Sequence, residues 1–235
     1  MVAYVGSKAA IAGHIGATLR RYQHNRRFWE PFCGGLNVTL ELSLNGEGVA
    51  SDIHLPLISL YRAILDGWNP PTNITGKNYH DFMRLPDNDP RKGFVGFFDS
   101  FGGMWGRTHA RRNPSNLRAT ARKIASVLRT LEVRGTSIEH RSFFDVPPHR
   151  DDDLIIYADP PYSDCDRRIY GLGAFDTPAF WNRCREWAGM GVPVFVSEYE
   201  APSFAELIWE VKKNVGICKG QRVNAITERL YKVGS

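Results

Sequence analysis

The tetrapeptide Asp159-Pro160-Pro161-Tyr162 is the part of the sequence with the most chemical content. It directly follows the apolar run 154–158, so a buried strand is expected to end on a stiff, charged loop. Two consecutive prolines have fixed φ angles and no N–H group, which holds Asp159 and Tyr162 at a set separation and leaves nearby carbonyl oxygens free to accept hydrogen bonds. Such acceptors beside an aromatic ring suit the exocyclic amino group of a nucleobase. A rigid turn with an N-capping aspartate would explain the tetrapeptide equally well.

A second candidate site follows the apolar segment 27–30, where the chain reaches the glycine pair Gly34-Gly35. Glycine allows the backbone to approach a ligand closely where a strand ends. Asp52 follows this pair at close to the interval of about 20 residues at which an acidic residue meets ribose hydroxyls in nucleotide-binding folds. Asp52 is equally suited to cap the helical segment 55–65, and the sequence leaves both roles open.

Residues 101–131 carry basic side chains without a single carboxylate. The basic residues are Arg107, Arg111, Arg112, Arg118, Arg122, Lys123 and Arg129. Apolar residues recur at helical spacing from Leu117 to Leu131, which places Arg118, Arg122 and Arg129 on a neighbouring polar stripe of one helix. The guanidinium fork suits phosphate groups, so the block indicates a polyanionic partner. A solvated helix face would produce the same pattern.

The remaining segments predict an α/β fold, because short apolar runs end at polar or glycine-rich residues and are followed by helical patterns. The predicted strands are 27–30, 48–51, 136–140, 154–158 and 192–197, with a closing hairpin around 214–232. Proline, glycine and asparagine are frequent between 68 and 106, and within this stretch 69–72 and 85–90 are predicted loops. We therefore expect one domain made of residues 1–66 and 135–235, interrupted by an inserted module at 67–134.

The composition fits one packed domain with an insertion. The chain has 235 residues, of which 43% are hydrophobic and 23% charged, and this excludes a disordered or fibrous protein. No apolar run approaches the roughly 20 residues of a membrane-spanning helix, so we expect the protein in the cytoplasm. If the gene is viral, we expect the protein in the cytoplasm of the host cell. The four cysteines form no close pair, and neither a metal site nor a disulfide is predicted.

Taken in order along the chain, these motifs resemble the DNA adenine N6-methyltransferases. The similarity rests on Tyr4-Val5-Gly6-Ser7-Lys8, the segment from Glu30 to Gly35, Asp52, the basic insertion and Asp159-Pro160-Pro161-Tyr162. This is the order of the family's branch with cofactor motif, recognition domain and catalytic motif, and segments 194–199 and 227–231 also look like it. The sequence departs from the family at Leu36, where many members have another glycine, and at Ala3, where relatives carry a lysine that helps to read the target site.

The resemblance implies a seven-stranded, Rossmann-like methyltransferase fold, S-adenosylmethionine as the methyl donor and double-stranded DNA as the partner. It implies cofactor-binding roles for Tyr4, Lys8, Phe32, Gly34, Asp52 and Asp159, and catalytic roles for Asp159, Pro160 and Tyr162. We expect a mainly helical recognition module that contacts DNA through Arg107, Arg111, Arg112, Arg118 and Arg122. The target adenine would rotate out of the duplex, and Asp159 would accept and orient its amino group.

Other functions remain compatible with the sequence. Cytosine N4 is another exocyclic amine, although serine is more usual than aspartate at the first position of the tetrapeptide in those enzymes, and enzymes of this kind also act on RNA. A non-catalytic DNA-binding protein on a decayed methyltransferase fold would have no need of Asp159. A nicotinamide-dependent oxidoreductase fits Asp52 but lacks the full glycine fingerprint. For Lys8, the usual role of a lone lysine before a helix is that of a solvated side chain.

Overall fold

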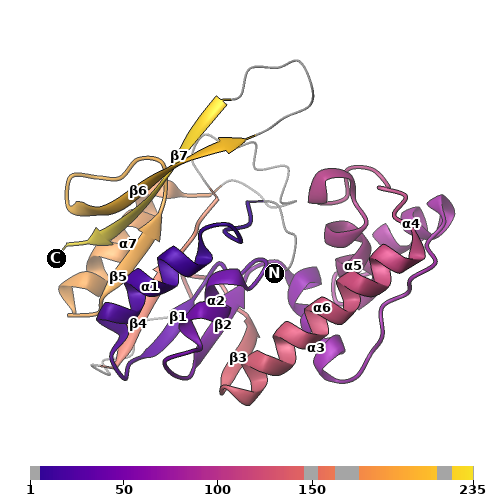
Figure 1. Ribbon diagram of the computed structural model, residues 1–235, viewed down its shortest axis with the longest axis horizontal. Helices are drawn as coiled ribbons and strands as arrows, with labels where there is room; N and C mark the ends of the chain where they lie inside the picture. The colour runs from indigo at the N-terminus through magenta and orange to yellow at the C-terminus, as the bar shows by residue number, and fades with distance from the viewer. Residues whose placement is uncertain (1–5, 146–152, 162–174, 216–223, 235) are drawn as a thin grey trace.

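The computed structural model describes residues 6–145, 153–161, 175–215 and 224–234. Its centre is a seven-stranded sheet of order β3-β2-β1-β4-β5-β7-β6 (Figure 1). The strands are β1 Arg27–Glu30, β2 Gly48–Asp52, β3 Thr136–His140, β4 Leu154–Ala158, β5 Val194–Ser197, β6 Ala205–Val215 and β7 Asn224–Val233. The first five run parallel, while β7 is antiparallel to β5 and β6. The α/β fold class and the seven-stranded sheet expected from the resemblance are confirmed.

The order of the strands reverses between β1 and β4, which lie side by side in the middle of the sheet. Trp29 of β1 is in register with Ile156 of β4, so the two strands end next to each other. In open α/β sheets, ligands bind where the strand order reverses, beyond the carboxyl ends of the strands. The glycine pair follows β1 and Asp159 follows β4, so both candidate sites lie at this position.

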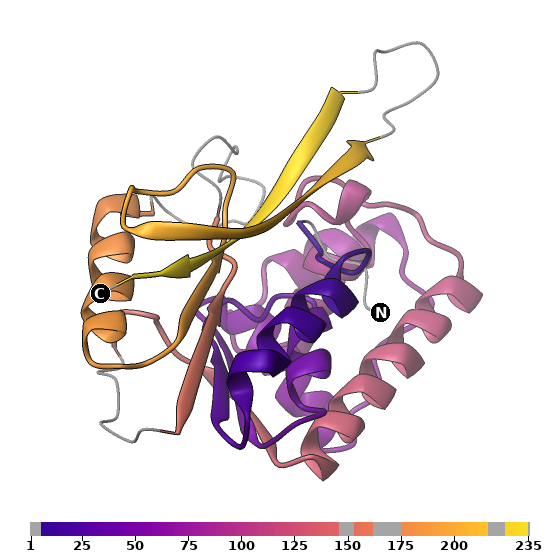
Figure 2. The ribbon, with the colours of Figure 1, turned by 60° about the vertical axis from the view of Figure 1, so that its left-hand side comes forward.

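Helices cover both faces of the sheet (Figure 2). Their bounds are α1 Ala12–Gln23, α2 Asn37–Leu42, α3 Leu55–Leu65 and α7 Thr177–Gly189. Successive residues of a strand point to opposite faces. Phe28 of β1 therefore packs in one buried cluster with Leu19 of α1, whereas Trp29 packs in another with Trp187 of α7.

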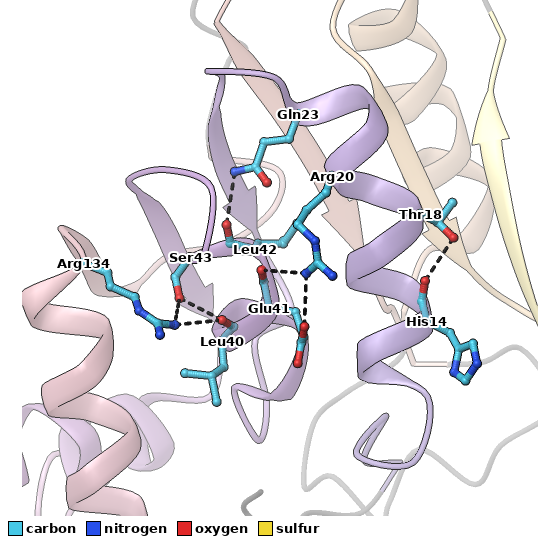
Figure 3. A network of polar contacts seen from close by, with 9 residues as sticks. All are labelled: His14, Thr18, Arg20, Gln23, Leu40, Glu41, Leu42, Ser43 and Arg134. Atoms are coloured by element: carbon cyan, nitrogen blue, oxygen red, sulfur yellow. Dashed lines mark hydrogen bonds and ion pairs between the residues drawn. The ribbon is translucent and has the colours of Figure 1, made fainter.

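Arginine side chains connect the short helix α2 to two longer helices, one on each side (Figure 3). Arg20 of α1 donates from Nη1 to Glu41 Oε2 at 3.1 Å. Arg134, which directly follows the last helix of the inserted segment, donates to the Leu40 carbonyl at 3.3 Å and to Ser43 Oγ at 3.1 Å. Because α2 begins directly after the glycine pair, these contacts hold that turn in place.

The segment between α3 and β3 is helical, as expected from the sequence. Its helices are α4 Gly76–Met83, α5 Pro90–Phe98 and α6 Pro114–Val133, with one turn of 3-10 helix at Phe101–Gly103. The apolar stripe predicted for 117–131 is buried, and it forms one continuous cluster with Tyr61 of α3 and Phe94 of α5. At Gly93 the backbones approach so closely that an added Cβ would lie 2.1 Å from the Pro56 carbonyl oxygen. The division of the chain into two units at 67 and 134 stays a prediction.

Two predicted strands begin at other residues in the structure, and the strand predicted for 48–51 extends one residue further, to Asp52. The closing hairpin begins already at Ala205 instead of near 214, because its first strand pairs with β7 along the whole length of both strands. The strand expected from 192 begins at Val194, since Pro193 has no N–H to donate to a neighbouring strand. Within the described part of the chain, no helix combines the length and apolar character needed to cross a bilayer.

Candidate active site

Lys8, Asp159 and Glu228 meet at the carboxyl ends of the central strands. The Lys8 Nζ atom lies 2.9 Å from Asp159 Oδ1 and 3.6 Å from Glu228 Oε2. Lys8 precedes α1, and its carbonyl accepts the N–H groups of Ile11 and Ala12 at the start of that helix. With 6% of its surface exposed, Lys8 is a buried member of the site, so the solvated role is wrong.

The two carboxylates determine the protonation of Lys8. Burial by itself lowers the pKa of the Lys8 ammonium, but the charges of Asp159 and Glu228 more than offset this effect, and the pKa lies above its ordinary value. Lys8 therefore stays positively charged at neutral pH. A cation at this distance favours the ionised form of Asp159, the form that accepts hydrogen bonds.

Glu30 adds a further carboxyl group at the end of β1. It is 3% exposed and accepts a hydrogen bond from the Thr39 hydroxyl. Burial raises the pKa of Glu30 well above its ordinary value, and the charges of Asp159 and Asp52 raise it further. Glu30 therefore holds a proton more readily than an exposed glutamate does.

Asp52 connects the glycine turn to the end of β2. Its Oδ2 accepts the Gly34 N–H at 3.2 Å, and its Oδ1 accepts the His54 N–H at 2.9 Å. Tyr61 of α3 donates its hydroxyl to the Gly34 carbonyl at 2.7 Å. The N-cap residue of α3 is His54, so Asp52 does not cap that helix. Burial raises the pKa of Asp52, while the two N–H groups counteract this effect in part.

The turn after β1 uses left-handed backbone conformations. Gly34 has a φ of 40° and Leu36 a φ of 58°. Glycine adopts such angles without steric cost, but a residue with a Cβ does so only under strain. Many members of the family that the sequence resembles have glycine at the position of Leu36. The left-handed backbone conformation of Leu36 gives a physical reason for glycine at this position.

Phe32 lies on the α7 side of the sheet and is half-buried. Its ring stacks on Phe143 with the centroids 5.6 Å apart, and its edge meets Phe180 at 5.9 Å. These contacts hold the ring directly beside the glycine turn. The predicted roles of Tyr4 and Tyr162 fall on residues outside those that the structure describes.

The loop 106–113 carries three of the five predicted DNA-contacting residues, Arg107, Arg111 and Arg112, and all three are exposed. The loop is held by Asp99, which is completely buried. Asp99 Oδ2 lies 3.0 Å from His109 Nε2, and Asp99 Oδ1 accepts the Arg112 N–H at 3.3 Å. The loop therefore has a defined conformation.

The other two predicted residues, Arg118 and Arg122, lie on α6, where both side chains are exposed. They line a groove against the segment from Gly67 to Thr72, and the three loop arginines do not belong to the lining of this groove.

Sequence reasoning assigned no role to Glu228 or Glu30. Glu228 lies within segment 227–231, whose similarity to the family was noted, and this similarity was the available signal. Glu30 opens the segment from Glu30 to Gly35 on which the resemblance also rests, and this was the corresponding signal.

Similar solved structures are methyltransferases by name, at low identity. HI0767 from Haemophilus influenzae, assigned as a methylase, is 8% identical with a TM-score of 0.43, covering 100% of this chain and 92% of that one. The yhhF protein from Escherichia coli, assigned as a methyltransferase, is 12% identical with a TM-score of 0.42, covering 96% and 85%. Precorrin-6y C5,15-methyltransferase from Geobacter metallireducens is 11% identical with a TM-score of 0.42, covering 100% and 93%.

A family match covers the part of the chain that contains the glycine turn, Asp52 and the inserted helices. The model of the D12 class N6 adenine-specific DNA methyltransferases matches residues 4–131, which is more than half of the sequence. Asp159 lies outside the matched region, at the position where the strand order reverses. Because the match covers more than half of the sequence, the chain belongs to the D12 class of N6 adenine-specific DNA methyltransferases.

Proposed function

We propose that this protein is a site-specific DNA adenine N6-methyltransferase that transfers a methyl group from S-adenosylmethionine to an adenine rotated out of the duplex. The observation that carries the proposal is the position of Asp159. It follows β4 directly, next to the glycine turn after β1, and is paired with Lys8 at 2.9 Å. Family membership supports both the donor and the DNA substrate.

The residues around the glycine turn suit the methyl donor. Asp52 lies at the end of β2, where an acidic residue can meet ribose hydroxyls, and the ring of Phe32 lies beside the turn. Asp52, Asp159 and Glu228 supply three carboxyl groups here, and Lys8 is the cation that lies among them. Such an acidic environment favours a positively charged ligand. When bound, S-adenosylmethionine supplies a methyl group on a positively charged sulfur.

In the proposed mechanism, Asp159 and a carbonyl oxygen of the proline loop accept hydrogen bonds from the two N–H groups of the adenine amino group. This directs the N6 lone pair out of the conjugated ring system. N6 would then bond to the methyl carbon while the carbon–sulfur bond breaks and its electron pair stays on the sulfur, and N6 would give up one proton to Asp159. Lys8 keeps Asp159 ionised before the transfer. Alignment of the reacting groups can lower the activation free energy of such a reaction by roughly 7 to 11 kcal/mol.

The direct test is to identify the methylated product. The purified protein is incubated with DNA and S-adenosylmethionine, the DNA is digested to nucleosides, and the modified base is identified by mass spectrometry. We expect N6-methyladenine. N4-methylcytosine would overturn the choice of base, methylation of RNA alone would overturn the choice of substrate, and no methylation would favour a binding protein on a decayed fold.

Replacing Glu228 with glutamine should shift the pH dependence of catalysis. Glu228 helps to raise the pKa of Lys8, so removing its charge lowers that pKa. Lys8 then loses its proton at lower pH, and the alkaline limb of the kcat profile should move toward lower pH. We expect kcat near neutral pH to fall by about tenfold, which corresponds to about 1.4 kcal/mol, because Glu228 no longer helps to hold the Lys8 ammonium beside Asp159.

The measurement is kcat over a pH series with the affinity for DNA recorded in parallel. Glu210→Gln is the matched control, because Glu210 lies on the other strand of the same hairpin and pairs with Arg229 at 3.0 Å on the surface. An alkaline limb that Glu228→Gln leaves in place would refute the role of Glu228.

Replacing Asp52 with asparagine should weaken the binding of S-adenosylmethionine. The substitution removes the charge while preserving the shape, and hydrogen bonds to charged groups contribute about 1.5–3 kcal/mol. We therefore expect the dissociation constant, measured by calorimetry, to rise by about ten- to hundredfold. Asp99→Asn is the control, because Asp99 is an equally buried aspartate that accepts a backbone N–H in the inserted segment. Equal affinities for the Asp52 variant and the unmodified protein would exclude the ribose-binding role.

Replacing one loop arginine with alanine should change the salt dependence of DNA binding. Each phosphate contact that is lost should flatten the slope of log affinity against log salt by about one unit. We expect this for Arg107, Arg111 and Arg112, measured with duplex DNA at several salt concentrations. Arg84→Ala serves as the control, because the Arg84 side chain is 80% exposed on the same segment. A slope shared by variant and control would place the loop arginines on the solvated surface.

A further inference from the structure

An open groove of about 970 Å³ runs along α6 on the outside of the molecule. One wall is the exposed face of α6, and the other is the segment from Gly67 to Thr72 that leads from α3 toward α4. The helix contributes Arg118, Arg122 and Arg129 to the lining, while the opposite wall contributes the half-buried Trp68. Neither wall contributes a carboxylate.

The arginines of this groove have no carboxylate within ion-pair distance among the residues that the structure describes. Several other arginines of the protein, Arg84, Arg91, Arg141, Arg183 and Arg229, each have a carboxylate partner within 4 Å. Within the described ranges, by contrast, no carboxylate forms an ion pair with Arg118, Arg122 or Arg129. Positive charges in a row without neighbouring negative charges repel one another, which raises the electrostatic free energy of the protein. A bound anion lowers this free energy.

The row of arginines is long enough to meet more than one phosphate of a polyanion. At a rise of about 1.5 Å per residue, Arg118 and Arg122 are roughly 6 Å apart along the helix, and Arg129 lies about 10 Å further. Between them, Ala121 and Ala125 present only a methyl group each. These small side chains let a ligand approach the helix surface while the guanidinium groups reach past them.

We propose that this groove binds a single strand of nucleic acid, with its phosphates on the three arginines and a base against Trp68. Single-stranded nucleic acids bind to proteins through a positively charged groove combined with aromatic side chains on which bases stack. The uncharged wall opposite α6 suits such a strand, since it repels neither phosphates nor bases. The inference rests on the proposed function only in taking nucleic acid as the ligand.

The groove is separate from the site around Asp159. The C-terminal end of α6 leads into the amino end of β3, and β3 runs parallel to its neighbour β2. The groove therefore extends toward the amino edge of the sheet, whereas Asp159 lies at the carboxyl edge. None of the groove residues contributes to the site that contains Lys8, Asp52 and Asp159.

The test compares two triple variants of the full chain with equal net charge. The groove variant has alanine in place of Arg118, Arg122 and Arg129. The control variant has alanine in place of three exposed basic residues of the same segment that lie outside the groove, namely Lys77, Arg84 and Lys123. The probe is a fluorescein-labelled single-stranded oligonucleotide of about 12 nucleotides. For the groove variant we expect the slope of log affinity against log salt to flatten by about two units, since each phosphate on a single strand contributes about 0.7.

The other outcomes are equally specific. Equal losses in the two variants would show a general charge effect and overturn the proposal, as would unchanged binding in the groove variant. Stronger binding of a duplex of the same sequence, or full competition by inorganic polyphosphate, would overturn the choice of a single strand. The methylation assay on duplex DNA separates this inference from the proposed function. Loss of single-strand binding in the groove variant alone supports the groove, and methylation that is absent from the unmodified protein refutes the enzyme alone.

Discussion

Replacing Asp159 with alanine should reduce methyl transfer by a factor of about 10² to 10⁴, the range in which positioned proton acceptors contribute to catalysis. Without its carboxylate, the amino group of the base loses both an acceptor and its orientation. The fold should survive, because Lys8 keeps Glu228 as a partner at 3.6 Å and the Asp159 side chain is only partly buried, with 17% exposed. Binding of S-adenosylmethionine and DNA should therefore change far less than turnover.

Single-turnover methylation assays, with calorimetry for the methyl donor and a DNA-binding assay, separate these effects. Asp153→Ala is a suitable control, because Asp153 is an exposed aspartate just before the other end of β4. Turnover close to that of the unmodified protein would remove Asp159 from the chemistry. It would also remove the main support for an enzyme that acts on an exocyclic amine.

Replacing Lys8 with methionine should have the second-largest effect, because the substitution leaves two carboxylates without the cation between them. The pKa of Asp159 should then rise, since the nearby positive charge that favours its ionised form is gone. The acid limb of the kcat profile should move to higher pH, and kcat should fall even where Asp159 is ionised. Breaking a buried pair by removing one partner also costs about 3 kcal/mol of stability.

The pH profile of kcat and the urea-induced unfolding of the Lys8 variant measure these two effects. In the double variant Lys8→Met with Glu228→Gln, one of the two uncompensated charges is gone, so part of the lost stability should return. Lys92→Met is the control, because Lys92 also pairs with an aspartate, at 2.6 Å to Asp87, but in the inserted segment. An acid limb that stays in place after Lys8→Met would show that Lys8 does not act on Asp159.

The sequence predicted individual elements well where the signal is local. Strands β1, β3 and β4 have the predicted bounds, and α6 covers the predicted stripe from Leu117 to Leu131. Strand and helix periodicities are properties of neighbouring residues, so they can be read without knowledge of the fold. Boundaries that depend on a distant partner were less accurate, as β6 shows, because the length of a hairpin strand is set by the strand with which it pairs.

Contacts between distant segments were harder to predict. Arg118 and Arg122 were grouped with the loop arginines because they are close in sequence, yet the start of α6 turns them toward the segment 67–72. Asp99 gave no signal as the anchor of the loop 106–113, because an aspartate at a helix end is ordinary. Only its complete burial and its bonds to His109 and Arg112 identify that role.

The types and order of the chemical groups were determined by the sequence alone. A carboxylate before two prolines, a glycine turn after a strand and an acid after the next strand predict a site for a nucleotide-like ligand, because backbone stiffness and side-chain chemistry are local properties. Only the tertiary structure decided which charges meet. The strand order places the ends of β1 and β4 together, and the returning strand β7 brings Glu228 to Lys8 from the other end of the chain. Burial then determines how these groups ionise, because the free energy of a charge depends on its surroundings and no single residue carries that information.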